Sequence, residues 1–276
     1  MRLRITFSKT EAMRYTSHLD LQRTWERTLR RAGLPLAYSQ GFNPRPKINL
    51  ATALPLGFTS QCEVADIWLE QDHATTEIES RLRDAVPPGM EILRVEEVDL
   101  TAPKLPKLVQ SAVYMVTLLE SIPAYDVSAQ NNGVKPEPHP LRQAQDTAST
   151  LAPAVTSAGV RSATQDAELY PKNIKMPLGI EQIPYDLAMR IVRVLGAETL
   201  MRERRGKLYD LRPLIEDLHA IDPAPEGWQR IIMRLSARSG ATGRPDEVLA
   251  VLEIPPHNAR VQRTELIFTE SKRSAT

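Results

Sequence analysis

Apolar and polar residues alternate at the start of the chain, and the spacing then becomes helical. From residue 2 to residue 7 every second residue is apolar, which is the pattern of a half-buried strand. Over residues 19–32, Leu21, Trp25 and Leu29 recur at every fourth position. This spacing predicts an amphipathic helix with Trp25 and Leu29 in the core.

The remaining first hundred residues continue this mixture of strands and helices. Ser17, followed three residues later by Asp20, marks the start of the helix, and Gly33 suits its end. The other predicted elements are strands at 36–39, 47–53, 63–69 and 90–100 and a helix at 75–86. The order β-α-β-β-α-β predicts the ferredoxin-like plan, with two helices on one face of an antiparallel sheet.

The second half repeats this order around an interruption. Residues 124–172 are rich in Ala, Ser, Thr, Gln, Pro and Asn and have little periodicity, which is typical of a disordered insertion or linker. Around this stretch the pattern predicts strands at 112–119, 207–218, 229–237 and 260–268, a helix at 185–194 with an extension past Gly196 toward 201, and a helix from residue 245.

The predicted fold class is therefore α+β, with two tandem ferredoxin-like (βαββαβ) domains. The first spans residues 1–103 and the second residues 104–270, which a disordered insertion at about 124–175 interrupts.

Charge is unevenly distributed along the chain. The formal net charge is only +1, but residues 1–50 carry ten basic residues against three acidic ones. Residues 51–100 carry eleven acidic residues against three arginines. This segregation predicts a basic face and an acidic face.

The single cysteine, Cys62, excludes several kinds of site. This chain alone cannot form an internal disulfide, a Cys-rich zinc site or an iron–sulfur cluster. No apolar run approaches the roughly 20 residues that span a bilayer, and the N-terminal residues lack the apolar core of a signal peptide. We expect a soluble, cytoplasmic protein that itself holds no cofactor or metal and contacts no membrane.

The predicted first helix carries a basic face. Arg23, Arg27, Arg30 and Arg31 fall within about 100° of one another on the helical wheel, and Glu26 is the one acid in the helix body. Arginine favours bidentate contact with phosphate and stacking on bases. This pattern predicts RNA binding; the alternative is a solvated arginine face.

The loop after this helix extends the basic surface. Gly41 allows unusual backbone geometry, and the prolines at 44 and 46 make the loop stiff. We expect it to hold Asn43, Arg45 and Lys47 in fixed directions and to offer Phe42 for stacking on a base. The alternative is a plain hairpin connection with Phe42 packed in the core.

His18 is the one catalytic candidate. With Tyr15, Arg14 and Arg23 nearby in the sequence, its imidazole could act as acid or base in RNA cleavage. The alternative is a histidine that caps or packs against the helix. The other histidines lack metal-ligand spacing, and no phosphate-binding glycine motif or hydrolase motif is present.

The other basic segment is residues 201–213. Arg202, Arg204, Arg205 and Lys207 come before the strand predicted at 207–218. They either continue the positive track or form a charged turn, with Asp210 and Arg212 as a surface ion pair.

The stretch Ser17–Gly57, SHLDLQRTWERTLRRAGLPLAYSQGFNPRPKINLATALPLG, together with residues 209–213 and 243–249, resembles a bacterial family of uncharacterised radical SAM-linked proteins (domain of unknown function 2344). The resemblance implies a partner enzyme that carries an iron–sulfur cluster and S-adenosylmethionine, and no catalytic residue can be carried over from the family. The predicted fold is also similar to the CRISPR RNA-processing endonuclease superfamily, an analogy of fold that does not fix function.

Three functional hypotheses follow. The first is an accessory protein of a radical SAM enzyme that binds RNA or presents a substrate and is not itself catalytic, with its acidic 63–99 segment facing the partner. The second is a metal-independent endoribonuclease that uses His18, and the third is a protein-interaction scaffold. No preference for DNA is predicted. The residues predicted to bind RNA are Arg14, Arg23, Arg27, Arg30, Arg31, Phe42, Asn43, Arg45, Lys47, Arg204 and Arg205.

Overall fold

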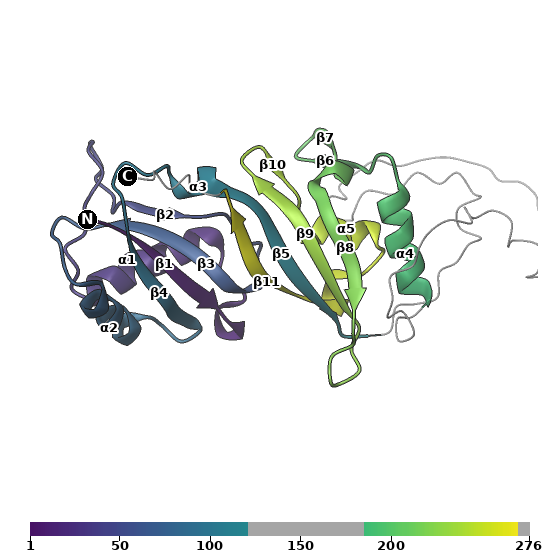
Figure 1. The fold of residues 1–276 in the computed structure, drawn as a ribbon, viewed down its shortest axis with the longest axis horizontal. Helices are drawn as coiled ribbons and strands as arrows, with labels where there is room; N and C mark the ends of the chain where they lie inside the picture. Colours follow the sequence, from purple (N-terminus) through teal and green to yellow (C-terminus); the bar gives the residue numbers. More distant parts are fainter. Residues whose placement is uncertain (121–184, 270–276) are drawn as a thin grey trace, which may run out of the picture. The chain divides into compact units, whose positions relative to one another are not determined.

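A computed structural model describes residues 1–120 and 185–269. The predicted disordered insertion at about 124–175 lies outside the described residues. The structure is a mixed α+β fold with a large, mostly antiparallel sheet and few helices (Figure 1). No helix in the described part is long and apolar enough to cross a membrane.

The first half begins with the predicted strand and helix. The strands are β1 (Arg2–Lys9), β2 (Ile48–Leu50), β3 (Thr59–Trp68) and β4 (Met90–Val98), and the helices are α1 (His18–Arg31) and α2 (Thr75–Ala85). The strands lie in the order β4-β1-β3-β2, and every neighbouring pair is antiparallel. The strand predicted at 36–39 forms only isolated bridges, at Leu36 and Tyr38.

One hydrophobic core holds this half together. The apolar side of α1 and the residues Ile78 and Leu82 of α2 pack with the alternating apolar residues of β1. The Trp25 ring meets the Phe7 ring edge to face, with centroids 5.0 Å apart. Because these contacts fix the rotation of α1, its arginine-rich side faces away from the core.

The second half adds more strands to the same sheet. Its elements are α3 (Leu105–Leu108), β5 (Val109–Leu118), α4 (Tyr185–Gly196), β6 (Met201–Arg204), β7 (Lys207–Asp210), β8 (Ile215–Ile221), β9 (Arg230–Arg238), β10 (Ala241–Thr242), α5 (Pro245–Val251) and β11 (Ala259–Phe268). The order β8-β9-β5-β11 is antiparallel throughout, and β10 pairs with β9 beside β8. A second hydrophobic core underlies this half.

The two halves meet through one short parallel pairing. In β11, Gln262 and Arg263 lie opposite Thr59 and Ser60 of β3. The described strands other than β6 and β7 therefore form one continuous nine-stranded sheet. The described residues belong to one compact unit, and the predicted boundary near residue 103 remains a prediction.

The strand predicted at 207–218 is wrong in its extent. It is divided into β7 and β8 by a short 3-10 helix at Arg212–Leu214. Asp210 ends β7 because its carboxylate accepts the backbone N–H groups of Leu200 (2.7 Å) and Arg212 (2.9 Å). Pro213 then supplies no N–H for a sheet.

Residues 201–204, which come before β7 in the sequence, form a strand of their own. They form β6, which pairs with β7 in a separate two-stranded hairpin. Arg205 and Gly206 make its turn with positive φ angles of 51° and 74°, as a tight hairpin turn requires.

Candidate functional site

Helix α1 is the first of two elements that build the site. Ser17 caps its N-terminus, because the Ser17 hydroxyl accepts the backbone N–H of Asp20 at 3.2 Å. Gly33 follows the helix with φ of 64°, the left-handed geometry common just past a helix end. Both end signals in the sequence are thus confirmed.

The second element is the loop of residues 40–44 with its closing residues. The Ser39 N–H donates to the Arg45 carbonyl at 2.8 Å, and the Lys47 N–H donates to the Ala37 carbonyl at 2.8 Å. The Arg45 N–H also donates to the Ser39 hydroxyl at 3.0 Å. These bonds close the loop at its base. At its tip Phe42 is fully exposed, so the alternative that packs Phe42 in the core is wrong.

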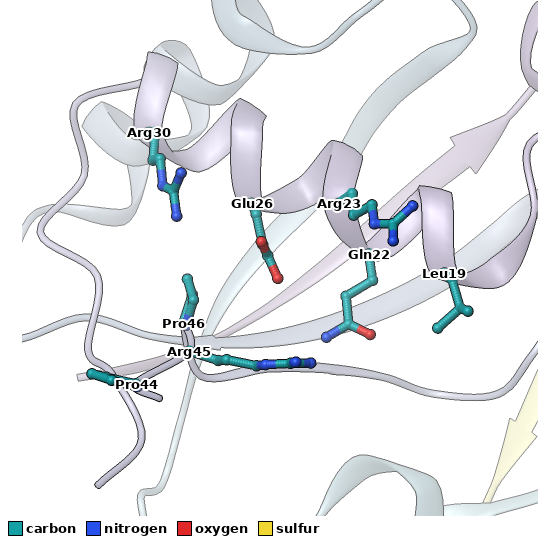
Figure 2. A pocket seen from close by; sticks show the side chains of 8 residues that line it. All are labelled: Leu19, Gln22, Arg23, Glu26, Arg30, Pro44, Arg45 and Pro46. Atoms are coloured by element: carbon teal, nitrogen blue, oxygen red, sulfur yellow. The ribbon is translucent and has the colours of Figure 1, made fainter. Parts of the chain in front are cut away.

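A hollow of about 300 Å³ lies between α1 and this loop. Its lining consists of Leu19, Gln22, Arg23, Glu26, Arg30, Pro44, Arg45 and Pro46. Figure 2 shows Gln22, Glu26 and Arg30 pointing from the helix toward the loop, with the Arg45 side chain running along the loop below them. Helix and loop therefore contribute arginines to the same concave surface.

The charges in the hollow are mostly positive and mostly uncompensated. Arg23 pairs with Asp20 at 3.2 Å on the exposed helix surface. Among the described residues, the side chains of Glu26, Arg30 and Arg45 form no hydrogen bond or ion pair. The three guanidinium groups outnumber the carboxylates of Glu26 and Asp20, which favours an anion, and Pro44 and Pro46 add flat apolar surface.

The other predicted arginines of α1 lie elsewhere. Arg27 is exposed but does not line the hollow. Arg31 donates to the carbonyl of Ala85 at 3.1 Å and so links the two helices. Asn43 of the loop and Lys47 after it are exposed and do not line the hollow.

Arg14 holds a neighbouring loop. Its Nε donates to the Gly57 carbonyl at 2.7 Å, and its guanidinium lies 5.5 Å from the centre of the Tyr15 ring. These contacts give Arg14 a structural role near the start of α1, outside the lining of the hollow.

Arg204 and Arg205 lie at the exposed end of the β6–β7 hairpin. They do not line the hollow. The Arg212 guanidinium donates to the carbonyls of Leu195 (3.0 Å) and Ile215 (3.2 Å), while Asp210 accepts backbone N–H groups. The surface ion pair that was the alternative for Asp210 and Arg212 is therefore not formed in the described part.

His18 is half-buried and is not part of the hollow. Burial lowers the pKa of its imidazole; Glu63 opposes this effect and Arg263 adds to it. Its Nδ1 is buried without a hydrogen-bond partner in the described residues. His18 therefore faces charged groups of the sheet, while the arginines of the hollow lie on another side of α1.

Those groups form a buried charged cluster that the sequence reasoning missed. Arg263 of β11 donates to Glu63 of β3 at 2.7 Å and to the Tyr114 hydroxyl of β5 at 3.2 Å. Lys9 of β1 donates to the carbonyls of Arg14 (3.2 Å) and Phe58 (3.0 Å). Burial lowers the pKa of Lys9, although the negative charge of Glu63 works in the other direction.

A signal for this cluster was present in the alternation of β1. Lys9 occupies the same alternate positions as the apolar residues of that strand, and such positions face the core. A lysine there predicts a buried ammonium group with polar partners. Within the described ranges no group of three or more His, Cys, Asp or Glu side chains is placed to hold a metal ion.

Comparison with known proteins identifies a family but no curated relative. No curated protein matches the chain. A family profile described as an uncharacterized protein conserved in bacteria (DUF2344) matches residues 2–245. Because the match covers far more than half of the sequence, the chain belongs to the bacterial DUF2344 family.

Proposed function

We propose that this protein binds RNA in the hollow between α1 and the loop, as a non-catalytic accessory protein of a radical SAM enzyme. The observation that carries the RNA proposal is the convergence of Arg23, Arg30 and Arg45 on one concave surface from two elements. Guanidinium groups match phosphate oxygens with paired hydrogen bonds. The exposed ring of Phe42, two residues before Pro44 in the same loop, offers a stacking surface for an unpaired base.

The test is binding of fluorescently labelled single-stranded RNA to the purified full chain, followed by anisotropy over a range of salt concentrations. The triple variant Arg23→Ala/Arg30→Ala/Arg45→Ala should bind at least about tenfold more weakly, because three phosphate contacts are lost. The slope of log affinity against log salt should fall by about two.

The matched control removes three arginines from other exposed places. Arg81, Arg83 and Arg94 each pair with a nearby glutamate, and their triple alanine variant changes the net charge equally. It should bind RNA much as the wild type does. The proposal would be contradicted if both triple variants lost RNA affinity equally, or if the variant of Arg23, Arg30 and Arg45 kept full affinity.

The radical SAM partner is proposed from the family resemblance. That enzyme would carry the iron–sulfur cluster and S-adenosylmethionine. The exposed acidic side chains on one side of α2, Glu77 and Asp84, offer a surface for it, whereas Glu63 and Asp66 of the predicted acidic segment are buried. Affinity purification of the tagged chain from a bacterium that encodes it should recover an iron–sulfur protein.

The strand order supports a finer proposal about the fold. The first half has the order β4-β1-β3-β2, and the second half has the corresponding order β11-β5-β9-β8. Both orders are those of a βαββαβ ferredoxin-like unit. We therefore infer two such units, joined where β11, the edge strand of the second, pairs with the end of β3 that β2 leaves uncovered.

The endoribonuclease alternative has less support, because His18 does not line the hollow. A protein-interaction scaffold remains the alternative if RNA affinity is absent at physiological salt.

A further inference from the structure

Glu26 is the one lining residue that does not suit a site for phosphate alone. It lies among Arg23, Arg30 and Arg45, yet its carboxylate forms no ion pair with a described residue. A carboxylate repels phosphate, so a site that binds only phosphate gains nothing from it. Glu26 points into the hollow from the same side of α1 as Gln22 (Figure 2).

A carboxylate accepts hydrogen bonds at two oxygens. Guanine is the nucleobase that presents two adjacent N–H donors on its Watson–Crick edge, at N1 and at the 2-amino group. Adenine and cytosine place an acceptor nitrogen beside their amino group, and this acceptor would repel the second carboxylate oxygen. Glu26 is therefore chemically complementary to guanine.

The neighbouring residues complete this match. The Gln22 amide carries two N–H donors, and one of them can bond the O6 atom of guanine. Leu19 and Pro44 supply apolar surface for the base and ribose. The volume of about 300 Å³ is that of a small ligand site, and the arginines remain available for the phosphates on either side.

We propose that the hollow binds one guanosine of a single-stranded RNA, with Glu26 accepting hydrogen bonds from N1–H and the 2-amino group. This inference rests on the RNA binding proposed above. It adds the identity of the base and gives Glu26 and Gln22 the role of selecting it.

The experiment uses labelled oligouridine strands that differ only at one central position, which holds uridine, guanosine, adenosine, cytidine or inosine. The full chain should bind the guanosine strand about tenfold more tightly than the uridine, adenosine and cytidine strands. Inosine lacks the 2-amino group, so its strand should bind with intermediate affinity.

Glu26→Gln should abolish the preference for guanosine and leave binding of the all-uridine strand equal or tighter, since a negative charge near the phosphates is removed. The control Glu97→Gln makes the same charge change on exposed β4 and should keep the preference. Equal affinity of the wild type for all five strands, or a preference that survives Glu26→Gln, would overturn the guanosine site while leaving RNA binding intact.

Two further outcomes have separate meanings. No binding of any strand would overturn the proposed RNA function and the guanosine site together. Free guanosine monophosphate that bound as tightly as the guanosine strand would overturn the assignment to RNA, because the ligand would then be a free nucleotide.

Discussion

Cys62 lies half-buried beside the Glu63–Arg263 pair. Burial, with a further contribution from the negative charge of Glu63, raises the pKa of its thiol to about 11. Since the thiolate is the reactive form, the native thiol should react with iodoacetamide about a hundredfold more slowly than the same thiol in the unfolded chain. Mass spectrometry of alkylated protein with and without urea measures this difference.

The pH dependence of alkylation is a second test of the Cys62 thiol. The alkylation rate of native Cys62 should rise about tenfold per pH unit from neutral pH upward, because the thiolate fraction grows until the pH reaches the pKa near 11. A rate that levels off near pH 9, or equal rates with and without urea, would show that the thiol is not shielded as described.

At the scale of single residues the sequence predicted faces but not contacts. Arg30 and Arg31 are adjacent on the predicted basic side of the helix, yet Arg30 lines the hollow and Arg31 donates to Ala85 of α2. A helical wheel gives the direction of a side chain. What lies in that direction depends on how α2 packs, and the local pattern does not contain that information.

At the scale of elements, the loop of residues 40–44 depends on the Ser39 hydroxyl, which accepts the Arg45 N–H. Ser39→Ala removes this bond and should let the loop open more often. Chymotrypsin should then cleave after the exposed Phe42 several-fold faster, since proteolysis follows local opening. Binding of RNA should also weaken, because a looser loop loses more entropy on binding.

Ser17→Ala is the matched control, because it removes a serine hydroxyl that also accepts a backbone N–H. It should lower the free energy of unfolding by about 1 kcal/mol through loss of the helix cap and leave cleavage after Phe42 nearly unchanged. Equal acceleration in both variants would mean that global stability, and not the Ser39 bond, controls the loop.

The sequence predicts an element well where local signals determine it and poorly where contacts between distant residues do. Helix α1 has a four-residue apolar spacing and signals at both ends, so its position was predicted to within one residue at each end. The division of 207–218 into β7 and β8 depends on the Asp210 carboxylate and its contact with the distant Leu200 N–H. The spacing of apolar residues does not predict such a contact.

At the scale of the whole molecule, the parallel pairing of β3 and β11 brings together residues 200 positions apart, such as Glu63 and Arg263. Sequence periodicity predicted most elements of each half but not the strands through which the halves join, because strand pairing depends on backbone groups that nearly every residue carries. The buried Glu63–Arg263 pair marks this junction.

Glu63→Gln tests how strongly this pair couples the two halves. The substitution leaves the guanidinium of Arg263 buried and without its counter-charge, which typically costs about 3–5 kcal/mol of unfolding free energy. The pair is almost completely buried in both partners, so water cannot replace the lost carboxylate. Urea denaturation followed by circular dichroism should show this loss, and amide exchange in β3 and β11 should accelerate together.

The control is Glu79→Gln on α2, which breaks an exposed pair with Arg83 and should cost less than about 1 kcal/mol. A double variant, Glu63→Leu with Arg263→Leu, should recover part of the stability lost in Glu63→Gln, since the buried guanidinium that lacks a counter-charge is then removed. If Glu63→Gln were as stable as Glu79→Gln, the buried pair would not hold the junction. The two halves would then depend only on the short backbone pairing and on the apolar residues around it.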